Sequence, residues 1–133
     1  MITCIDFRFH SDIRDFLVSL GLKDNYDMVS LAGATKDLVS RDEASANVIL
    51  KQIDISYRLH AVKKIVIIQH MDCGAYGGHA GFDNFEAEKA KQIADMKKAS
   101  EIIRGEHSDL EIEHILARID ESGDKPSIDF EIV

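Results

Sequence analysis

The chain has 133 residues, 45% of them hydrophobic, and a formal net charge of −8. This length predicts a single domain, residues 1–133, and the acidic surplus argues against a nucleic-acid partner, which needs a basic surface. The apolar runs fall far short of the roughly 20 residues that span a bilayer, and the start of the chain lacks a signal-peptide pattern, so we expect no membrane partner and a cytoplasmic location.

A strand from Ile2 to Arg8 is expected at the start of the chain. Because successive side chains of a strand point to opposite faces, Cys4, Asp6 and Arg8 would share one face. A thiol, a carboxylate and a guanidinium are unusual on a face that packs into a core. Their alternation therefore indicates a reactive site at the end of this strand.

Helical and extended patterns alternate through the first half of the chain. The expected elements are a helix capped by Ser11 that runs to about Leu20 before Gly21, a strand over 26–31, a small-residue turn from Ala32 to Thr35, and a helix over 43–59 capped by Ser40 or Asp42. Each helix carries apolar residues at helical spacing, so both are expected to pack on a sheet.

The continuous β-branched run from Lys64 to Gln69 predicts a strand buried on both faces of a parallel sheet. The residues His70-Met71-Asp72-Cys73 follow at its carboxyl end, and a glycine-rich loop comes next. This loop lacks the G-x-x-x-x-G-K-S/T pattern of a phosphate-binding loop, so we interpret it as a flexible loop over a site.

A third helix, about residues 84–104, precedes two strands, 112–119 and 128–133, whose short connection predicts a hairpin. The buried positions of this helix are expected to be Phe85, Ala90, Ile93, Met96, Ile102 and Ile103. The complete pattern predicts an α/β fold, a three-layer α-β-α domain with a mostly parallel sheet of four to five strands. The expected order is 2-1-3-4, with strand 5 antiparallel.

Polar side chains gather at the carboxyl ends of strands one and three, where ligands of such sheets bind. If these strands are neighbours, the thiols of Cys4 and Cys73 and the imidazole of His70 can meet there. Two thiolates and one imidazole supply three ligands for Zn2+ and leave the fourth position open, as in catalytic zinc sites. His10 and His79 remain candidates for a fourth ligand.

Carboxylates and an arginine accompany that expected site. Asp6 can fill the fourth position or accept a hydrogen bond from a zinc-bound water, and Arg8 can clamp the Asp6 carboxylate with two nitrogens. Asp72 and Gln69 are candidates for the groups that hold the ligating imidazole.

The two motifs, Cys4-x-Asp6-x-Arg8 and His70-x-x-Cys73, together resemble the paired motifs of the β-class carbonic anhydrases. The resemblance covers nearly the whole chain and implies a β-carbonic-anhydrase-like fold. It implies that Cys4, His70 and Cys73 bind zinc and that Asp6 and Arg8 form a catalytic pair. It also implies reversible hydration of carbon dioxide to bicarbonate by zinc-bound hydroxide, in a homodimer or higher homo-oligomer.

The sequence departs from that family's pattern in three places. It lacks the helices that usually precede the first strand, residues 30–34 read Ser-Leu-Ala-Gly-Ala instead of Arg-Asn-Ala-Gly-Asn, and bulky Phe7 and Phe9 flank the catalytic pair. Phe7, with Val29, Leu31 and Tyr76, is expected to form apolar walls that suit an uncharged linear substrate.

Three other functions stay open at this point. One is a non-catalytic zinc-binding or sensing protein on the same scaffold. Another is a hydrolase of carbonyl sulfide or carbon disulfide. The third is a metal-free domain whose two thiols, Cys4 and Cys73, do redox chemistry.

Overall fold

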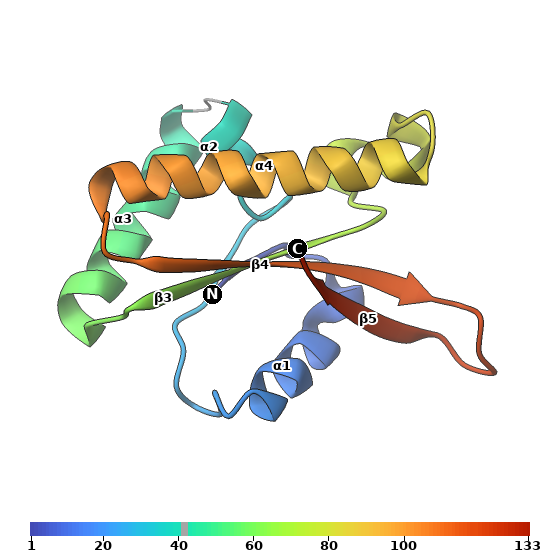
Figure 1. The fold of residues 1–133 in the computed structure, drawn as a ribbon, viewed down its shortest axis with the longest axis horizontal. Coiled ribbons are helices and arrows are strands. Elements are labelled where there is room, and N and C mark those ends of the chain that lie inside the picture. The colour runs from blue at the N-terminus through green and yellow to red at the C-terminus, as the bar shows by residue number, and fades with distance from the viewer. Residues whose placement is uncertain (41–42) are drawn as a thin grey trace.

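The computed structural model describes residues 1–40 and 43–133, in which a five-stranded sheet lies between two layers of helices (Figure 1). The strands are β1 (Ile2–Thr3), β2 (Val29–Ser30), β3 (Lys64–His70), β4 (Glu111–Asp120) and β5 (Ser127–Ile132). Their order is β2-β1-β3-β4-β5, parallel except for the antiparallel β4–β5 hairpin. The predicted fold class, strand order and hairpin are confirmed.

Helices cover both faces of the sheet (Figure 1). The four α-helices are α1 (His10–Ser19), α2 (Lys36–Ser40), α3 (Glu43–His60) and α4 (Phe85–Glu106) in the described part of the chain. One hydrophobic cluster joins the sheet to α2, α3 and α4, and a second joins the opposite face to α1.

The central strand β3 contributes side chains to both hydrophobic clusters. Ile65 and Ile67 belong to the cluster under α2, α3 and α4, whereas Val66 and Ile68 belong to the cluster under α1. This division explains the continuous apolar run, because a parallel strand covered on both faces needs apolar side chains at every position.

The first strand is shorter than expected. The chain remains extended as far as Ile5, whose backbone N–H donates to the Leu31 carbonyl, and then enters a 3-10 turn at Phe7–Phe9. The Asp6 carboxylate caps this turn by accepting a hydrogen bond from the Arg8 backbone N–H. The predicted strand from Ile2 to Arg8 is therefore wrong beyond its first half, because a local side-chain cap competes with strand pairing.

Several helix boundaries also differ from the predictions. Helix α1 begins at His10 without a side-chain cap, so the expected Ser11 cap is wrong, whereas Gly21 follows the helix with a φ of 76°. The short helix α2 was not predicted. The expected cap at Asp42 lies outside the described residues.

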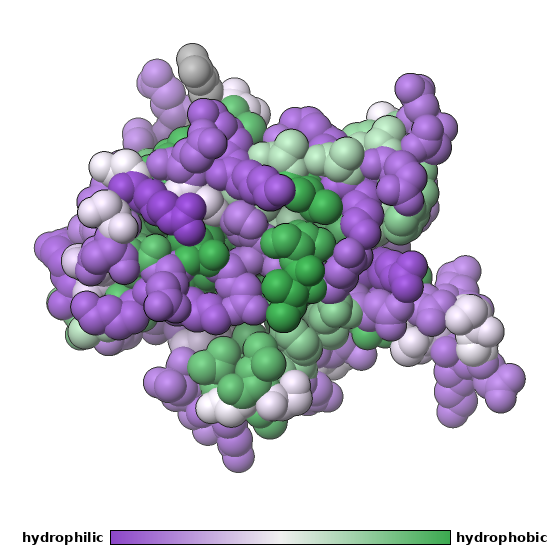
Figure 2. Space-filling model, viewed as in Figure 1, coloured by the Kyte–Doolittle hydropathy of each residue, from purple (hydrophilic) through white to green (hydrophobic). Residues whose placement is uncertain are grey.

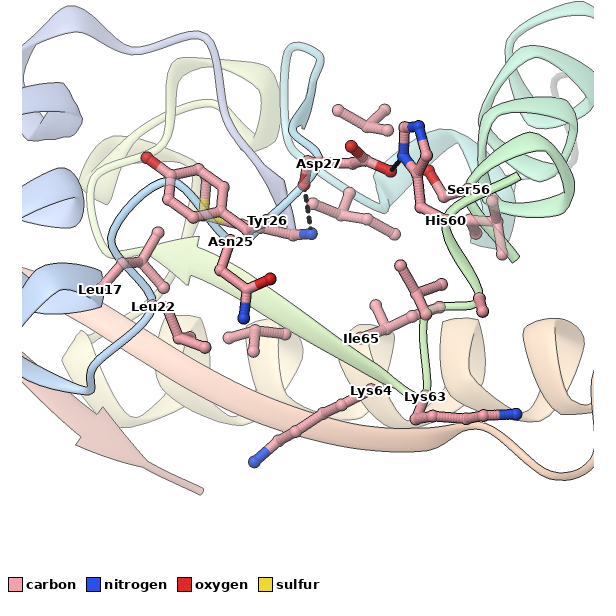
Figure 3. Close-up of a pocket in the computed structure, with 17 residues that line it drawn as sticks. Leu17, Leu22, Asn25, Tyr26, Asp27, Ser56, His60, Lys63, Lys64 and Ile65 are labelled. Atoms are coloured by element: carbon pink, nitrogen blue, oxygen red, sulfur yellow. Dashed lines mark hydrogen bonds and ion pairs between the residues drawn. The ribbon is translucent and has the colours of Figure 1, made fainter. Parts of the chain in front are cut away.

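A cavity of about 340 Å³ lies at the amino ends of β1 and β3, between the end of α3 and the segment after α1 (Figure 3). Its lining includes Ile2, Val29 and Ile65. This edge of the sheet is opposite the carboxyl ends, where Cys4 and Cys73 lie, so the cavity is separate from the predicted site. Val29, expected beside that site, lines this cavity instead.

Hydrophilic side chains dominate the molecular face that carries α4, β4 and β5 (Figure 2). Hydrophobic surface gathers on this face where Figure 1 marks the C-terminus, and Ile132 of the edge strand β5 is 67% exposed. Among the described helices, none is both long and apolar enough to cross a membrane.

Candidate metal centre

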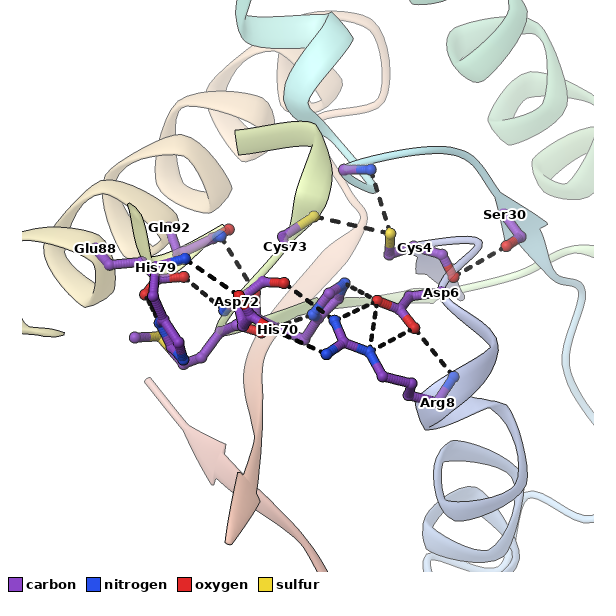
Figure 4. Close-up of polar contacts among 12 residues, drawn as sticks. Cys4, Asp6, Arg8, Ser30, His70, Asp72, Cys73, His79, Glu88 and Gln92 are labelled. Carbon is purple, nitrogen blue, oxygen red and sulfur yellow. Dashed lines mark hydrogen bonds and ion pairs between the residues drawn. The ribbon is translucent and has the colours of Figure 1, made fainter. Parts of the chain in front are cut away.

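The side chains of Cys4, His70 and Cys73 converge at the carboxyl ends of β1 and β3 (Figure 4). Because β1 pairs in parallel with β3, the residues that follow the two strands are brought together. One ligand atom from each residue lies within 4.8 Å of the others, and all three residues are buried. This group could hold a metal ion.

The spacing of the two sulfur atoms suits a tetrahedral ion. Cys4 Sγ lies 3.9 Å from Cys73 Sγ. A tetrahedral zinc ion with bonds of about 2.3 Å to each sulfur would separate two thiolates by roughly 3.8 Å. The two cysteines therefore need almost no rearrangement to share one ion.

The imidazole of His70 has one nitrogen committed and one without a partner. Nδ1 lies 2.8 Å from the Met71 carbonyl oxygen, which can only accept, so Nδ1 donates the hydrogen bond. Nε2 is buried and has no hydrogen-bond partner among the residues that the structure describes. An unsatisfied buried acceptor is costly, and a metal ligand is the role that a neutral Nε2 in this tautomer suits.

The thiols are electrostatically coupled. The hydrogen bond between them lowers the pKa of Cys4, which becomes the thiolate acceptor, with further help from the Gly33 backbone N–H 3.3 Å from its sulfur. The same hydrogen bond raises the pKa of Cys73, because its proton is held by the Cys4 thiolate. A divalent cation would replace that shared proton, since a metal binds both cysteines as thiolates.

The turn after β2 supports Cys4 from the other side. Gly33 has a φ of 75°, and a Cβ placed there would lie 3.0 Å from Cβ atoms of Ala75 and Lys36. Both the conformation and the limited space favour glycine here. This turn, expected from Ala32 to Thr35, contributes the Gly33 backbone N–H as a donor to the Cys4 sulfur.

Arg8 holds the Asp6 carboxylate beside the centre. Its Nε lies 3.0 and 3.1 Å from the two Asp6 oxygens, and Nη2 lies 2.7 Å from Oδ2. Asp6 Oδ2 is in turn 3.8 Å from His70 Nε2, so the carboxylate borders the same space as the ligand atoms. The clamp that the sequence suggested is present, although Arg8 reaches Asp6 across the 3-10 turn and not along a strand.

The third guanidinium nitrogen of Arg8 extends the network to the second strand end. Nη1 lies 2.9 Å from Asp72 Oδ2, and Nη2 lies 3.1 Å from the Asp72 carbonyl oxygen. Hydrogen bonds from Arg8 lower the pKa of both Asp6 and Asp72, and these carboxylates raise the pKa of Arg8. All three groups are therefore charged at neutral pH.

Helix α4 contacts the segment that carries His70 and Cys73. Glu88 Oε1 accepts the Asp72 backbone N–H at 2.6 Å, Glu88 Oε2 lies 2.5 Å from His79 Nδ1, and Gln92 Nε2 donates to the His70 carbonyl at 3.2 Å. These contacts were missed in the sequence, which predicted an apolar buried face including Phe85 and Ala90.

A second polar network connects β3 to the turn after β2 and to helix α4. Gln69 Nε2 lies 3.0 Å from Thr35 Oγ1 and 3.2 Å from the Tyr76 hydroxyl, which donates to Asp95 Oδ2 at 2.9 Å. Burial and the nearby Asp95 carboxylate raise the pKa of Tyr76, so this hydroxyl remains protonated. Gln69 and Asp72 do not hold the His70 imidazole as expected, because the Met71 carbonyl takes that place.

The two histidines considered as a fourth ligand, His10 and His79, lie outside the three-residue group. His79 pairs with Glu88, and His10 is exposed at the start of α1. The expected apolar walls also differ, since Phe7 is 83% exposed and Leu31 packs against the core under α2, α3 and α4.

The fold and site together define an α/β domain with a Cys2His group at the carboxyl ends of two neighbouring parallel strands. A family model described as "putative carbonic anhydrase" matches residues 1–122, and the chain belongs to this family.

The chain is also 34% identical over 124 residues to an uncharacterized protein of Rickettsia conorii, covering 90% of this chain and 67% of the relative. An uncharacterized protein of Rickettsia bellii is 31% identical over 124 residues, which are 90% of this chain and 76% of that relative. No solved structure matches the chain significantly.

Proposed function

We propose that this chain is a β-class carbonic anhydrase that catalyses the reversible hydration of carbon dioxide to bicarbonate. Cys4, His70 and Cys73 are the proposed zinc ligands. The observation that carries the proposal is the buried group of two sulfurs and one imidazole nitrogen within 4.8 Å, in a chain of this family. The unpartnered His70 Nε2 and the sulfur spacing support it.

Zinc in this centre would lower the pKa of a water molecule and so supply a hydroxide nucleophile near neutral pH. With two cysteines and one histidine as ligands, one coordination position stays open. The charge of the two thiolates offsets that of the metal, so we expect weaker acidification than at a site of three histidines.

Asp6 is the residue proposed to orient the nucleophile. Its Oδ2 borders His70 Nε2, and its lowered pKa makes it a hydrogen-bond acceptor and not an acid at neutral pH. Arg8 binds both carboxylate oxygens of Asp6 and thereby keeps this side chain from the open position. In this arrangement Asp6 would accept a hydrogen bond from a water bound to the zinc and so orient the oxygen of that water toward carbon dioxide.

A second copy of the chain is proposed to complete the substrate pocket. Ile5 is 56% exposed and Phe7 is 83% exposed, and both flank Asp6 in the chain. Apolar side chains beside a site for an uncharged linear substrate would be covered in a homodimer. Light scattering at micromolar concentration tests this, and a mass of one chain would contradict it.

Metal content gives the first test of the centre. We expect close to one zinc per chain in freshly purified protein, and Cys73→Ser should lose most of it. Less than about half an equivalent of zinc in the wild type would contradict the metal hypothesis and favour redox chemistry of the free thiols.

Stopped-flow hydration of carbon dioxide gives the second test. We expect a rate above that of buffer in the wild type and strong losses in Asp6→Ala and Cys73→Ser. Asp15→Asn, at an exposed position of α1, should match the wild type. A zinc-loaded protein with no rate above buffer would remove the proposal. Turnover of carbonyl sulfide or carbon disulfide in its place would indicate a hydrolase, and no turnover of any of the three would indicate a zinc-binding or sensing protein.

A further inference from the structure

Helix α4 turns a polar face toward the sheet near its N-terminal end. Glu88, Gln92 and Asp95 are 1%, 0% and 5% exposed, and their spacing of four and three residues places them on one side of the helix. Burying a carboxylate or an amide costs free energy unless its polar atoms form hydrogen bonds. The partners of these side chains therefore explain why this face is polar.

All three side chains contact the segment from Gln69 to His79. Asp95 accepts from Tyr76, and Gln92 donates to the carbonyl of His70 itself. Glu88 makes the shortest contacts, at 2.6 Å to the backbone N–H of Asp72 and 2.5 Å to the ring of His79.

The peptide that Glu88 holds is a strained one. Asp72 has a φ of 57°, a left-handed conformation that is uncommon for residues other than glycine. In this conformation the Asp72 side chain and carbonyl oxygen both face Arg8, which holds Asp6. Strain of this kind persists only where surrounding contacts hold it in place.

We propose that Glu88 is a positioning residue for the metal centre. By fixing the Asp72 peptide, it sets the separation of His70 and Cys73 on either side, and through Arg8 it sets the place of the Asp6 carboxylate. This inference rests on the proposed zinc function. It assigns a role to the buried side chain of Glu88, which does not itself touch the metal or the substrate.

Two substitutions separate this role from helix packing. Glu88→Ala removes both hydrogen bonds, whereas Glu88→Gln keeps an oxygen that can accept from the Asp72 N–H. Glu86→Ala is the matched control, because Glu86 is exposed on the same turn of α4. If Glu88→Ala does not fold, the comparison of Glu88→Gln with Glu86→Gln replaces it.

The first readout is zinc affinity by chelator competition, together with the visible absorption of the Co2+-substituted protein. We expect Glu88→Ala to bind zinc about 10- to 100-fold more weakly and to shift the Co2+ bands, with partial recovery in Glu88→Gln and no change in Glu86→Ala. Wild-type affinity and an unchanged Co2+ spectrum in Glu88→Ala would overturn the inference, even if the variant were less stable.

The second readout needs no metal. In the metal-free protein, the Asp72 amide should exchange its hydrogen with solvent at least about tenfold faster in Glu88→Ala than in the wild type. Unchanged exchange would overturn the role of Glu88 independently of any zinc chemistry. Conversely, a wild type that binds no zinc would overturn the proposed function. Even then, faster exchange of the Asp72 amide in Glu88→Ala would support the proposal that Glu88 holds this peptide in place.

Discussion

The ring of Phe9 lies against the ring of His70, with centroids 4.3 Å apart and planes inclined by 34°. Phe9 is 1% exposed and belongs to the cluster that joins α1 to the sheet. The turn that ends β1 thus places an apolar ring beside the imidazole, while the Met71 carbonyl holds its Nδ1. His70 is confined on two sides by the fold itself.

Replacing Phe9 should therefore damage both stability and metal binding. We expect Phe9→Ala to lower the free energy of unfolding by about 3–5 kcal/mol, because it leaves a cavity between α1 and the sheet. Zinc affinity should fall as well, since His70 gains freedom. Urea unfolding and chelator competition measure the two effects. Phe85→Ala, at a position 43% exposed on α4, is the control and should cost much less; equal losses in the two variants would contradict this account.

Arginine cannot be exchanged for lysine at position 8. The guanidinium of Arg8 binds Asp6 through Nε and Nη2 and Asp72 through Nη1, a geometry that a single ammonium cannot reproduce. We expect Arg8→Lys to reduce carbon dioxide hydration by about 10- to 100-fold while the zinc content stays unchanged. Stopped-flow rates and metal analysis test this. Arg14→Lys, in an exposed pair with Asp15, should behave as the wild type, and a fully active Arg8→Lys would show that the clamp is dispensable.

Periodicity and motif spacing together predicted most of the architecture. The run from Lys64 to Gln69 predicted a strand covered on both faces, and in the structure it forms β3, the central strand of the sheet. The two motifs then placed Cys4, His70 and Cys73 at neighbouring strand ends, where the structure brings them together.

The turn at Asp6 could not be predicted from alternation. Cys4, Asp6 and Arg8 alternate like strand residues, yet the Asp6 carboxylate accepts the Arg8 backbone N–H and ends the strand. Such local competition between a side-chain cap and strand pairing leaves no periodic signal.

The polar face of α4 was missed for a different reason. Charged residues on helices are usually exposed, and Glu88 was not among the residues expected to be buried. Its burial depends on partners from another part of the chain, Asp72 and His79. A weak signal was available, because the apolar stripe of α4 is interrupted at Glu88 and Gln92 at helical spacing.

A side chain at Gly33 should destabilise the protein. Alanine at this position would need a φ near 75° and would bring its Cβ within 3.0 Å of Ala75 and Lys36. We expect Gly33→Ala to lower the free energy of unfolding by about 1–3 kcal/mol and to weaken zinc binding by displacing the N–H that contacts the Cys4 sulfur.

Gly105 offers the matched control for that substitution. It lies within α4, and an added Cβ there meets nothing within 4 Å. Gly105→Ala should therefore raise the free energy of unfolding by about 0.5–1 kcal/mol. Chemical unfolding of both variants measures the pair, and the same sign for the two substitutions would refute the steric account.

His114 should make the stability of the chain depend on pH. It is half-buried on β4 with Nε2 2.6 Å from Ser100 Oγ, and burial together with Arg104 and Lys97 of α4 lowers its pKa below the usual 6.5. The unfolded chain therefore binds this proton more readily than the folded chain. Protonation of His114 therefore lowers the free energy of unfolding as the pH falls below about 6.5. This effect is absent well above that pH.

Replacement of His114 by glutamine tests this contribution against the remaining titrating groups. We expect the stability of the wild type to fall more steeply than that of His114→Gln between about pH 7.5 and 5.5, because the variant has lost the group that protonates on unfolding. His10→Gln, at the exposed start of α1, controls for the loss of a histidine and should follow the wild type. The measurement is urea unfolding of the metal-free proteins across this range, so that metal binding at the proposed centre does not contribute to the difference between variants. Parallel curves for the wild type and His114→Gln would mean that α4 does not disfavour the charged imidazole.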